Sequence, residues 1–416
     1  MNTVNLPLLR PFPALRPAPG RAAEVAAPPY DVLDSAEARM MAAGRPWSFL
    51  HVSKPEIDLD PGIDVYSAPV YAKAAANFTR MIEQGVLVRD PAPRYYVYRL
   101  AMGDHVQTGI VGGASIAAYE SGRIRRHELT RPSKEDDRVR QVEAVSAHTG
   151  PVMIAHRPNT AIKAVLADQA KGEPASSVEL AGVHHTLWVV SDAQVVGTLR
   201  DAFDGLDALY IADGHHRSNA AVRVAKARRA AGGTAPDAWY ESFLTVVFAA
   251  DEMRILDYNR VVRDLNGLDA GELLRRVEEH FTVEPTAGEA RPRSRREFGM
   301  YVAGRWYRLA VRNEPKAGGN AVAGLDISLL TERLLSPVLG IGDPRVDPRI
   351  DFVGGIRGLK ELAWRVDSGE MAVAFAVYPT SMEDLMAVSD AGQIMPPKST
   401  WFEPKLADGL VSLMLD

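Results

Sequence analysis

The sequence predicts an α+β fold with more than one folded unit. Short, uncharged apolar runs alternate irregularly with amphipathic, charge-rich segments, and they do not follow the strand–helix–strand repeat of a doubly wound sheet. The 416 residues are enough for two or three domains. We expect an α+β domain over residues 1–235 and an α/β C-terminal domain over 236–416, joined near the segment AGGTAPDA at 231–238.

Composition narrows the class of protein. Hydrophobic residues make up 46% and charged residues 24%, which is ordinary for a globular protein in water. The net charge of −5 does not indicate a nucleic-acid-binding surface. The absence of cysteine excludes disulfides, cysteine-ligated metals and a thiol nucleophile. Neither a signal peptide nor a long apolar span is evident, so we expect a cytoplasmic protein with no nucleic-acid or membrane partner.

Hydrophobic periodicity and capping signals give the expected elements in order. The first expected helix begins after Asp34, with Glu37 completing a capping box, and the helix near 133 is expected to be capped by Ser133. Helices are expected over 35–43, 66–84, 133–148, 160–170, 192–203, 269–280, 326–337, 356–368 and 381–390, and one follows the strand at 208–212. Strands are expected over 46–53, 94–101, 107–119, 152–155, 177–180, 186–190, 208–212, 243–250, 255–262, 281–285, 297–302, 305–312 and 371–377.

The sequence also predicts one strand pairing, one bulge or close contact within a strand and one long loop. The strand at 255–262 is expected to pair with 243–250 across Asp251 and Glu252. Gly112 and Gly113, in the middle of the 107–119 strand, indicate a bulge or the close approach of another backbone. The segment 313–323 is expected to be a loop.

The strongest functional signal is the turn Asp213-Gly214-His215-His216-Arg217. A buried strand precedes it and a helical pattern follows, so the first unpaired N–H groups of the helix would form an anion site. Gly214 would let a phosphate approach the backbone, and Arg217 could bind it with two hydrogen bonds. Asp213 could orient an imidazole or hold a metal. The alternative is structural: Asp213 caps the helix, while His215 and His216 are ordinary buried or surface side chains.

Three further stretches carry unusual chemistry. In the charged stretch 123–138, cations Arg126, Lys134 and Arg138 could neutralise an anion, with Glu128 or Asp137 as a base or magnesium ligand. That stretch could equally be a solvated face crossed by ion pairs.

At the C-terminal end, MPPKSTWFEPKL places Lys398, Ser399 and Thr400 side by side, which suits phosphate oxygens. Alternatively, Trp401 and Phe402 attach this tail to the core. Near the N-terminus, the two prolines of APPYDV could hold Tyr30 and Asp31 in a fixed position or could form a plain edge segment.

Common nucleotide and hydrolase motifs are missing from the chain. It has no P-loop, no G-x-G-x-x-G turn after a strand, no G-x-S-x-G elbow and no H-E-x-x-H helix. A nucleotide would therefore have to be bound by a different arrangement.

The motifs PFPALRP…APPYDVL, HELTRPSKEDDR, ADGHHR and MPPKSTWFEPKL together resemble a widespread bacterial and archaeal family of uncharacterised proteins, often encoded beside serine-biosynthesis genes. The strand–DGHHR–helix turn is also similar to the phosphate-binding turn of the ParB/sulfiredoxin fold and of ParB-like free serine kinases. The resemblance implies a ParB/sulfiredoxin-like nucleotide-binding core followed by a second α/β C-terminal region.

Carried over by position, the resemblance implies phosphate contacts from Gly214, His215, His216 and Arg217, and a magnesium or base-side role for Asp213. Glu128 is the chosen counterpart of the kinases' catalytic glutamate. The missing cysteine excludes sulfiredoxin chemistry, and the absence of a basic helix-turn-helix disfavours DNA partitioning. Ser218 and Asn219 stand where the family usually has a tyrosine and an acidic residue.

These observations give one leading hypothesis and two alternatives. The leading one is a nucleotide-dependent small-molecule kinase that uses ATP or ADP with Mg²⁺ on a small hydroxylated metabolite such as free serine. Its site would comprise catalytic Glu128, Asp213 and His216, with Asp213 also the metal ligand, and cofactor-binding Gly214, His215, Arg217, Lys134, Arg138, Lys398, Ser399 and Thr400. A homodimer is compatible with these features. The alternatives are a non-catalytic nucleotide-binding switch and a metal-dependent hydrolase built on Asp213, His215 and His216.

Overall fold

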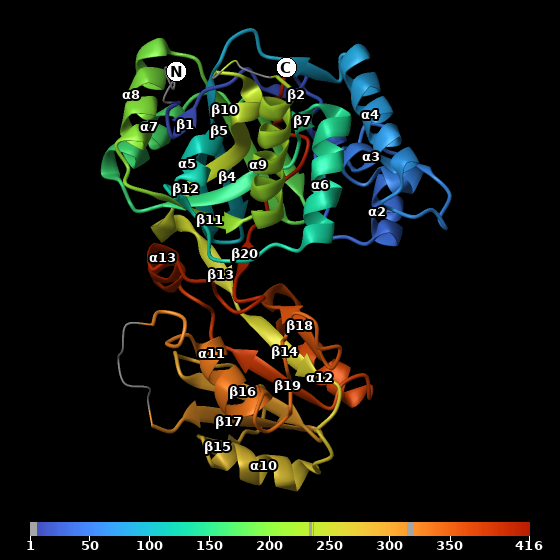
Figure 1. Ribbon diagram of the computed structural model, residues 1–416, viewed down its shortest axis with the longest axis vertical. Helices are drawn as coiled ribbons and strands as arrows, with labels where there is room; N and C mark the ends of the chain where they lie inside the picture. The colour runs from blue at the N-terminus through green and yellow to red at the C-terminus, as the bar shows by residue number, and fades with distance from the viewer. Residues whose placement is uncertain (1–5, 233–234, 236, 314–319) are drawn as a thin grey trace. The chain divides into compact units, whose positions relative to one another are not determined.

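The computed structural model describes residues 6–232, 235, 237–313 and 320–416 (Figure 1). The expected linker at 231–238 and the expected loop at 313–323 fall partly outside these residues. The chain divides into two compact units. The first unit comprises 1–126, 130–253 and 404–416, and the second comprises 127–129 and 254–403. Among the described residues, no helix is both long and apolar enough to cross a membrane.

The first unit is built on a large mixed sheet. Within the described residues its nine strands are β1 (Leu9–Arg10), β4 (Tyr95–Met102), β5 (His105–Ser115), β6 (Ile124–Arg125), β8 (Val152–His156), β9 (Ser176–Leu180), β10 (Val183–Val190), β11 (Leu209–Asp213) and β12 (Ser242–Ala249). Their order is β6-β11-β8-β12-β5-β4-β10-β9, with β1 added beside β5. The pairs β6–β11 and β8–β12 are parallel and the others are antiparallel.

Helices and two small ribbons complete the first unit. The helices are α1 (Ala22–Val25), α2 (Ser35–Ala42), α3 (Leu50–Ser53), η1 (Pro55–Asp58), α4 (Ala68–Glu83), α5 (Ile116–Glu120), α6 (Pro132–Val145), α7 (Thr160–Gln169), α8 (Ala193–Asp204), α9 (His215–Ala230), η2 (Trp239–Glu241) and η3 (Ala250–Glu252). The ribbons pair β2 (Leu15–Pro17) with β3 (Leu87–Arg89) and β7 (Ala147–His148) with β21 (Leu413–Met414). Helix α9 packs against β8, β12 and α6, and α6 in turn packs on α4 (Figure 1).

The second unit contains an antiparallel sheet of six strands within the described residues. In order these are β15 (Phe281–Pro285), β17 (Arg305–Val311), β16 (Glu297–Val302), β19 (Val373–Val377), β14 (Tyr258–Val262) and β18 (Ile350–Gly354). A separate ribbon pairs β13 (Arg254–Leu256) with β20 (Trp401–Glu403). The helices are α10 (Ala270–Glu278), α11 (Asp326–Leu330), which continues as a π-helical turn η4 (Thr331–Leu335), η5 (Gly355–Arg357), α12 (Gly358–Asp367) and α13 (Met382–Asp390).

The mixed α+β class is confirmed, but the division of the chain differs from the expected one. Strand β12 lies past residue 235 and is central to the first sheet, because it pairs with both β5 and β8. The first unit therefore runs to Met253 and also includes 404–416. The second unit was expected to be α/β, but its sheet is antiparallel throughout the described strands, so the α/β description does not hold there.

Four local expectations are wrong, each for a physical reason. Residues 46–53 contain the helix α3, because Phe49, Leu50 and Val52 bury their side chains together in one core. Helix α6 starts at Pro132, the favoured residue for a first helical position, so Ser133 is not the cap.

The other two corrections concern strands. β5 ends at Ser115, whose hydroxyl accepts the N–H of Ala118 and starts α5. Residues 255–262 form β13 and β14, which pair with β20 and with β18 and β19 instead of with β12.

One detailed expectation is confirmed. Asp34 and Glu37 form the capping box of α2, each side chain accepting the other's backbone N–H. Gly112 and Gly113 were expected to mark a bulge or the close approach of another backbone, but the nearest atoms belong to side chains. A Cβ at Gly112 would come within 2.7 Å of the Leu9 side chain of β1, and a Cβ at Gly113 would lie 3.1 Å from the Cβ of Ser242 in β12.

Candidate functional site

The turn between β11 and α9 has the predicted geometry. Strand β11 ends at Asp213 and α9 begins at His215, with Gly214 between them in a left-handed conformation at φ 96° and ψ 30°. A Cβ on Gly214 would lie 3.4 Å from both the Arg217 Nε and the Val152 Cα. Glycine therefore supplies both the rare backbone conformation and the close packing against β8.

Asp213 is held by one backbone donor and one ammonium. Its Oδ1 accepts the N–H of Gly214 at 2.9 Å, and its Oδ2 lies 3.1 Å from the Nζ of Lys405. Loss of hydration disfavours the charged carboxylate, but the charges of Lys405 and Arg217 outweigh that effect and hold the pKa of Asp213 well below its usual value. Asp213 is therefore an ionised carboxylate in direct contact with a cation.

Arg217, in the first turn of α9, is the principal cation of the turn. Its side chain is only 10% exposed, one terminal nitrogen donates to the Pro151 carbonyl, and the other lies 3.4 Å from Asp31. Burial opposes the guanidinium charge, but Asp31 and Asp213 favour it more strongly, so the pKa is raised. Within the described residues its Nε has no hydrogen-bond partner. A permanently charged group with a spare donor thus lies at the start of the helix.

A second carboxyl, Asp408, lies beside Arg217. The backbone N–H and C=O of Asp408 pair with Ala27, which fixes the C-terminal segment against the APPYDV segment. A Cβ on Gly150 would lie 3.3 Å from both the Asp408 Oδ1 and the Arg217 Cδ, so these two side chains converge. Asp408 is 2% exposed, and its Oδ1 has no hydrogen-bond partner among the described residues. Burial raises the pKa of Asp408 to about 7, with Arg217 opposing and Asp31 reinforcing the rise.

Arg138 of α6 joins the same group of charges. Its guanidinium stacks 3.8 Å from the centre of the Tyr30 ring and lies 2.7 Å from Asp137. Asp137 in turn accepts the Tyr71 hydroxyl at 2.9 Å. Burial weakens the Arg138 charge, but Tyr30 and Asp137 contribute to a net rise in its pKa.

We call the whole group the turn cluster. Its members come from four separate stretches of the first unit: Asp31, Arg138, Asp213, Arg217, Lys405 and Asp408.

The other predicted residues of the first unit have more specific structural roles. Lys134 donates to the Tyr66 hydroxyl at 2.9 Å on the exposed side of α6. The His216 Nε2 accepts the N–H of Arg131 at 3.0 Å, so it anchors the residue before α6 and is the unprotonated nitrogen of that ring. His215 is buried at the first turn of α9. In the described part of the chain, Asp213, His215 and His216 do not form a three-ligand group.

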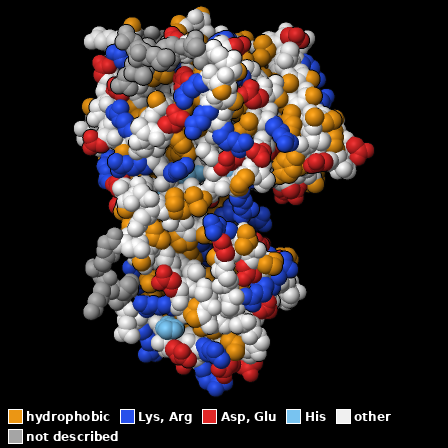
Figure 2. Space-filling model, in the orientation of Figure 1, with side chains coloured by type: hydrophobic (Ala, Val, Ile, Leu, Met, Phe, Trp, Pro, Cys, Tyr) orange, Lys and Arg blue, Asp and Glu red, His pale blue; other side chains and the backbone are white. Residues whose placement is uncertain are grey.

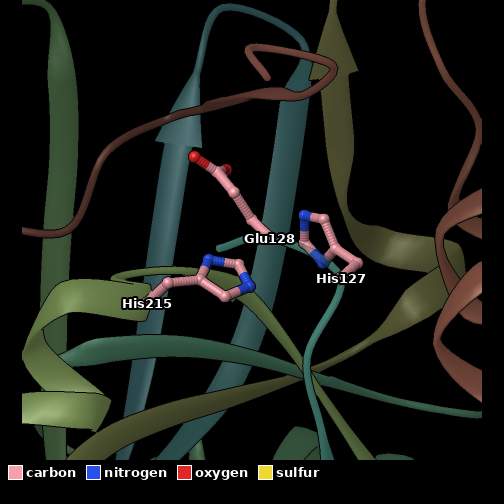
Figure 3. A group of neighbouring side chains, drawn as sticks. All are labelled: His127, Glu128 and His215. Carbon is pink, nitrogen blue, oxygen red and sulfur yellow. The ribbon is translucent and has the colours of Figure 1, made fainter. Parts of the chain in front are cut away.

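Four predicted residues belong to the second unit. Figure 3 shows Glu128 beside His127 on the stretch after β6, and His215 at the start of α9. The Lys398 ammonium lies 5.6 Å from the Tyr258 ring centre. The Ser399 hydroxyl donates to the Pro396 carbonyl at 2.7 Å, and the Ser399 carbonyl accepts the Thr380 hydroxyl at 2.8 Å. Thr400 precedes β20. The nucleotide-binding roles of these residues stay predictions.

Sequence reasoning missed two members of the turn cluster. Lys405 lies in the same C-terminal motif as Lys398 and contacts Asp213, whereas the site predicted from sequence names only Lys398. Asp408 gave no sequence signal, because its position depends on a backbone pairing with Ala27 across most of the chain. For Asp31 the sequence allows both a functional and a structural interpretation, and the structure places its carboxylate 3.4 Å from Arg217.

Surface charge in the first unit is mixed. On the face drawn in Figure 2, basic and acidic side chains are interspersed over this unit. This agrees with the small net charge of −5.

Comparisons with known proteins identify a family. No curated protein sequence matches the chain. Among solved structures, a conserved hypothetical protein from Pyrococcus furiosus is 13% identical, covering 74% of this chain and 96% of its own, with a TM-score of 0.35. A free serine kinase in complex with AMP is 14% identical, with coverages of 71% and 86% and a TM-score of 0.34. C-terminally truncated SbnI from Staphylococcus aureus is 11% identical, with coverages of 72% and 85% and a TM-score of 0.38.

Similarity at this level establishes no activity. The family model described as "Protein of unknown function (DUF1015)" matches residues 9–328, well over half of the sequence, and the chain therefore belongs to that family.

Proposed function

We propose that the protein is a nucleotide-dependent phosphotransferase that acts on a small hydroxylated metabolite, with free serine as the first acceptor to test. The Asp213–Arg217 turn would bind the nucleotide phosphates. The observation that carries this proposal is the meeting of a helix start, a buried arginine and a lysine at one glycine-containing turn. The motif resemblance to ParB-like serine kinases is consistent with it.

The helix start favours anions for a geometric reason. Helix α9 is 16 residues long, and its first N–H groups have no carbonyl partner within the helix. Its dipole adds a partial positive charge at that end. Gly214 has no side chain that would keep an anion from those N–H groups. Phosphoryl transfer depends mainly on positioning and charge neutralisation, which such a turn provides.

Lys405 and Asp213 suggest how a metal would fit. Mg²⁺ commonly binds through one or two carboxylates together with substrate phosphates. The Asp213 carboxylate is ionised and already accepts a cation, the Lys405 ammonium, at its Oδ2. In the proposed complex Asp213 would hold Mg²⁺, and the released Lys405 would bind a phosphate oxygen. The ion would supply charge neutralisation at the phosphates.

A phosphotransferase also needs a group that accepts the hydroxyl proton. Glu128 is the residue proposed from sequence. Within the first unit, Asp31 is a second candidate, because its side chain is 42% exposed and lies 3.4 Å from Arg217. A carboxylate beside the phosphate-binding arginine would be well placed to receive that proton.

The metal-dependent hydrolase is less well supported. The Nε2 of His216 already accepts the N–H of Arg131, and among the described residues Asp213, His215 and His216 do not form a three-ligand group. Consecutive histidines on a helix also point in directions about 100° apart.

A thermal-shift panel tests the proposal. ATP, ADP, CTP and GTP are each added with and without Mg²⁺ to the wild type, to Arg217→Met and to the control Arg223→Met. Arg223 lies on the same helix but is 41% exposed and pairs with Glu135 and Asp136. A nucleotide at 100 times its Kd should stabilise the wild type and the control by about 2.7 kcal/mol. Arg217→Met should lose this stabilisation.

A serine phosphorylation assay with the nucleotide that binds then decides between enzyme and switch. Formation of phosphoserine supports the phosphotransferase. Tight binding without turnover on serine or other hydroxylated metabolites supports the switch instead. If no nucleotide stabilises the wild type, or if Arg217→Met responds as the control does, the proposed phosphate site is wrong.

A further inference from the structure

A buried arginine in the second unit has no carboxylate partner among the described residues. Arg260 lies in β14, between β18 and β19 of the six-stranded sheet, and its side chain is one of the largest that are fully buried, at 2% exposure. Charged groups are rarely buried so completely unless they are paired, because the loss of hydration costs several kcal/mol.

The partners of Arg260 are neutral. One terminal nitrogen donates to the Tyr258 carbonyl and the other to the Pro397 carbonyl at 3.2 Å, and the guanidinium lies 5.3 Å from the Phe352 ring centre. Among the described residues, no carboxylate lies within ion-pair distance. A guanidinium has five N–H donors, and these two carbonyls accept from two of them. Burial lowers the pKa of Arg260 to about 9, which still leaves the group charged at neutral pH.

Arg260 lines a small pocket whose other charges are already balanced. Two carboxylates and one further arginine line it as well. Asp384 lies 3.0 Å from Arg295, and Asp326 lies 2.6 Å from Arg296, so each carboxylate has its own cation. Tyr378, Thr380 and Ser399 contribute to the wall. The pocket has room for about one water-sized group.

We propose that this pocket binds one oxygen of a small oxyanion, a phosphate or carboxylate group, which serves as the counter-ion of Arg260. An anionic oxygen fits a pocket with room for one water-sized group, and it carries the charge opposite to that of Arg260. Arginine suits this role because its planar fork of donors matches oxyanion geometry. The Pro397 carbonyl belongs to the C-terminal MPPKST motif, so that motif would help hold the anion-binding guanidinium in place. The proposal concerns the second unit alone and does not depend on nucleotide binding by the first.

The experiment compares anion-dependent thermal stability in three forms of the full-length protein. These are the wild type, Arg260→Met and the control Arg305→Met, whose residue is exposed at the start of β17 and does not line the pocket. Sodium phosphate, acetate and chloride are titrated at constant ionic strength. At saturating phosphate or acetate, Tm of the wild type and the control should rise by about 2–4 °C more than that of Arg260→Met.

The variants separate specific binding from general salt effects. Phosphate stabilises most proteins by exclusion from their surface, and that effect would be equal in all three forms. An equal rise in all three forms therefore overturns the proposal, as does a specific response to chloride alone. A response to both phosphate and acetate supports a general oxyanion site, and a response to one of them names the group.

A second variant covers the case in which Arg260→Met does not fold. Thr380→Asp keeps the arginine and adds a carboxylate to the pocket wall. If the pocket needs an anion, this built-in counter-ion should raise the Tm without phosphate and remove the response to added phosphate. A Thr380→Asp protein that responds to phosphate as the wild type does would contradict the proposal.

Discussion

The buried carboxyl of Asp408 gives a quantitative prediction. Its pKa rises from 3.8 to about 7 in the folded protein, mainly because burial disfavours the charge. Each pKa unit corresponds to about 1.4 kcal/mol, so ionising Asp408 in the native state costs about 4 kcal/mol. The perturbation that removes this cost is Asp408→Asn, which keeps the shape of the neutral side chain.

The sign of the effect follows from proton linkage. Between pH 4 and 7 the native protein holds the Asp408 proton and the unfolded chain has lost it. The contribution of Asp408 to stability is therefore fully present below pH 4 and is lost as the pH rises through 7. We expect the free energy of unfolding of the wild type to fall relative to that of Asp408→Asn by about 4 kcal/mol between pH 4 and pH 8.

Urea unfolding of both proteins at intervals of half a pH unit measures this difference. Other titrating groups affect both proteins alike, so only the difference between the two curves matters. The Asp31→Asn substitution tests the cause of the shift, because the Asp31 charge helps raise the pKa of Asp408. When Asp408→Asn is compared with its parent in a protein that carries Asp31→Asn, the midpoint of the difference curve should move to lower pH. Parallel curves for wild type and Asp408→Asn would refute the account of this carboxyl.

Three more substitutions test the turn and one helix start. Gly214→Ala forces a left-handed alanine and should destabilise the protein by about 1–2 kcal/mol in urea unfolding, and also weaken nucleotide binding in the thermal-shift panel. Lys405→Met removes the ammonium beside Asp213, so the pKa of Asp213 should rise in a carboxyl NMR titration; an unchanged pKa would mean that the contact is not formed. Asp34→Ala breaks the capping box with Glu37 and should cost about 0.5–2 kcal/mol, seen as a lower Tm by circular dichroism.

Local sequence patterns predicted most elements because these depend on neighbouring residues. Strand β11, the turn and α9 follow directly from an apolar run, a glycine and a helical pattern. The capping box of α2 depends on two residues three positions apart, so it too was visible in the sequence. The strand predicted over residues 46–53 is wrong because a stretch of mixed apolar and polar residues fits a short strand or a short helix equally well. Packing against Phe78 decides between them.

Long-range pairing was beyond the reach of these patterns. Strand β12 belongs to the first unit because it pairs with β5 and β8, about a hundred residues or more earlier in the chain. The contact of Lys405 with Asp213 spans 192 residues, and no local pattern specifies such a partner. For the same reason the sequence indicates a charged C-terminal motif but does not show that Lys405 contacts Asp213.

The C-terminal motif explains why one short segment matters to both units. Its earlier half lies in the second unit, where the Pro397 carbonyl holds the buried guanidinium of Arg260. Its later half lies in the first unit, where Lys405 contacts Asp213, and Asp408 follows shortly after, pairs with Ala27 and borders Arg217. The prolines of the motif restrict the backbone and so reduce the entropy lost when these partners are fixed. Lys398, Ser399 and Thr400 indicated a phosphate site from the sequence. The structure adds three groups of the same segment that contact or border the charged side chains of the two proposals. The Pro397 carbonyl contacts Arg260, Lys405 contacts Asp213, and Asp408 borders Arg217.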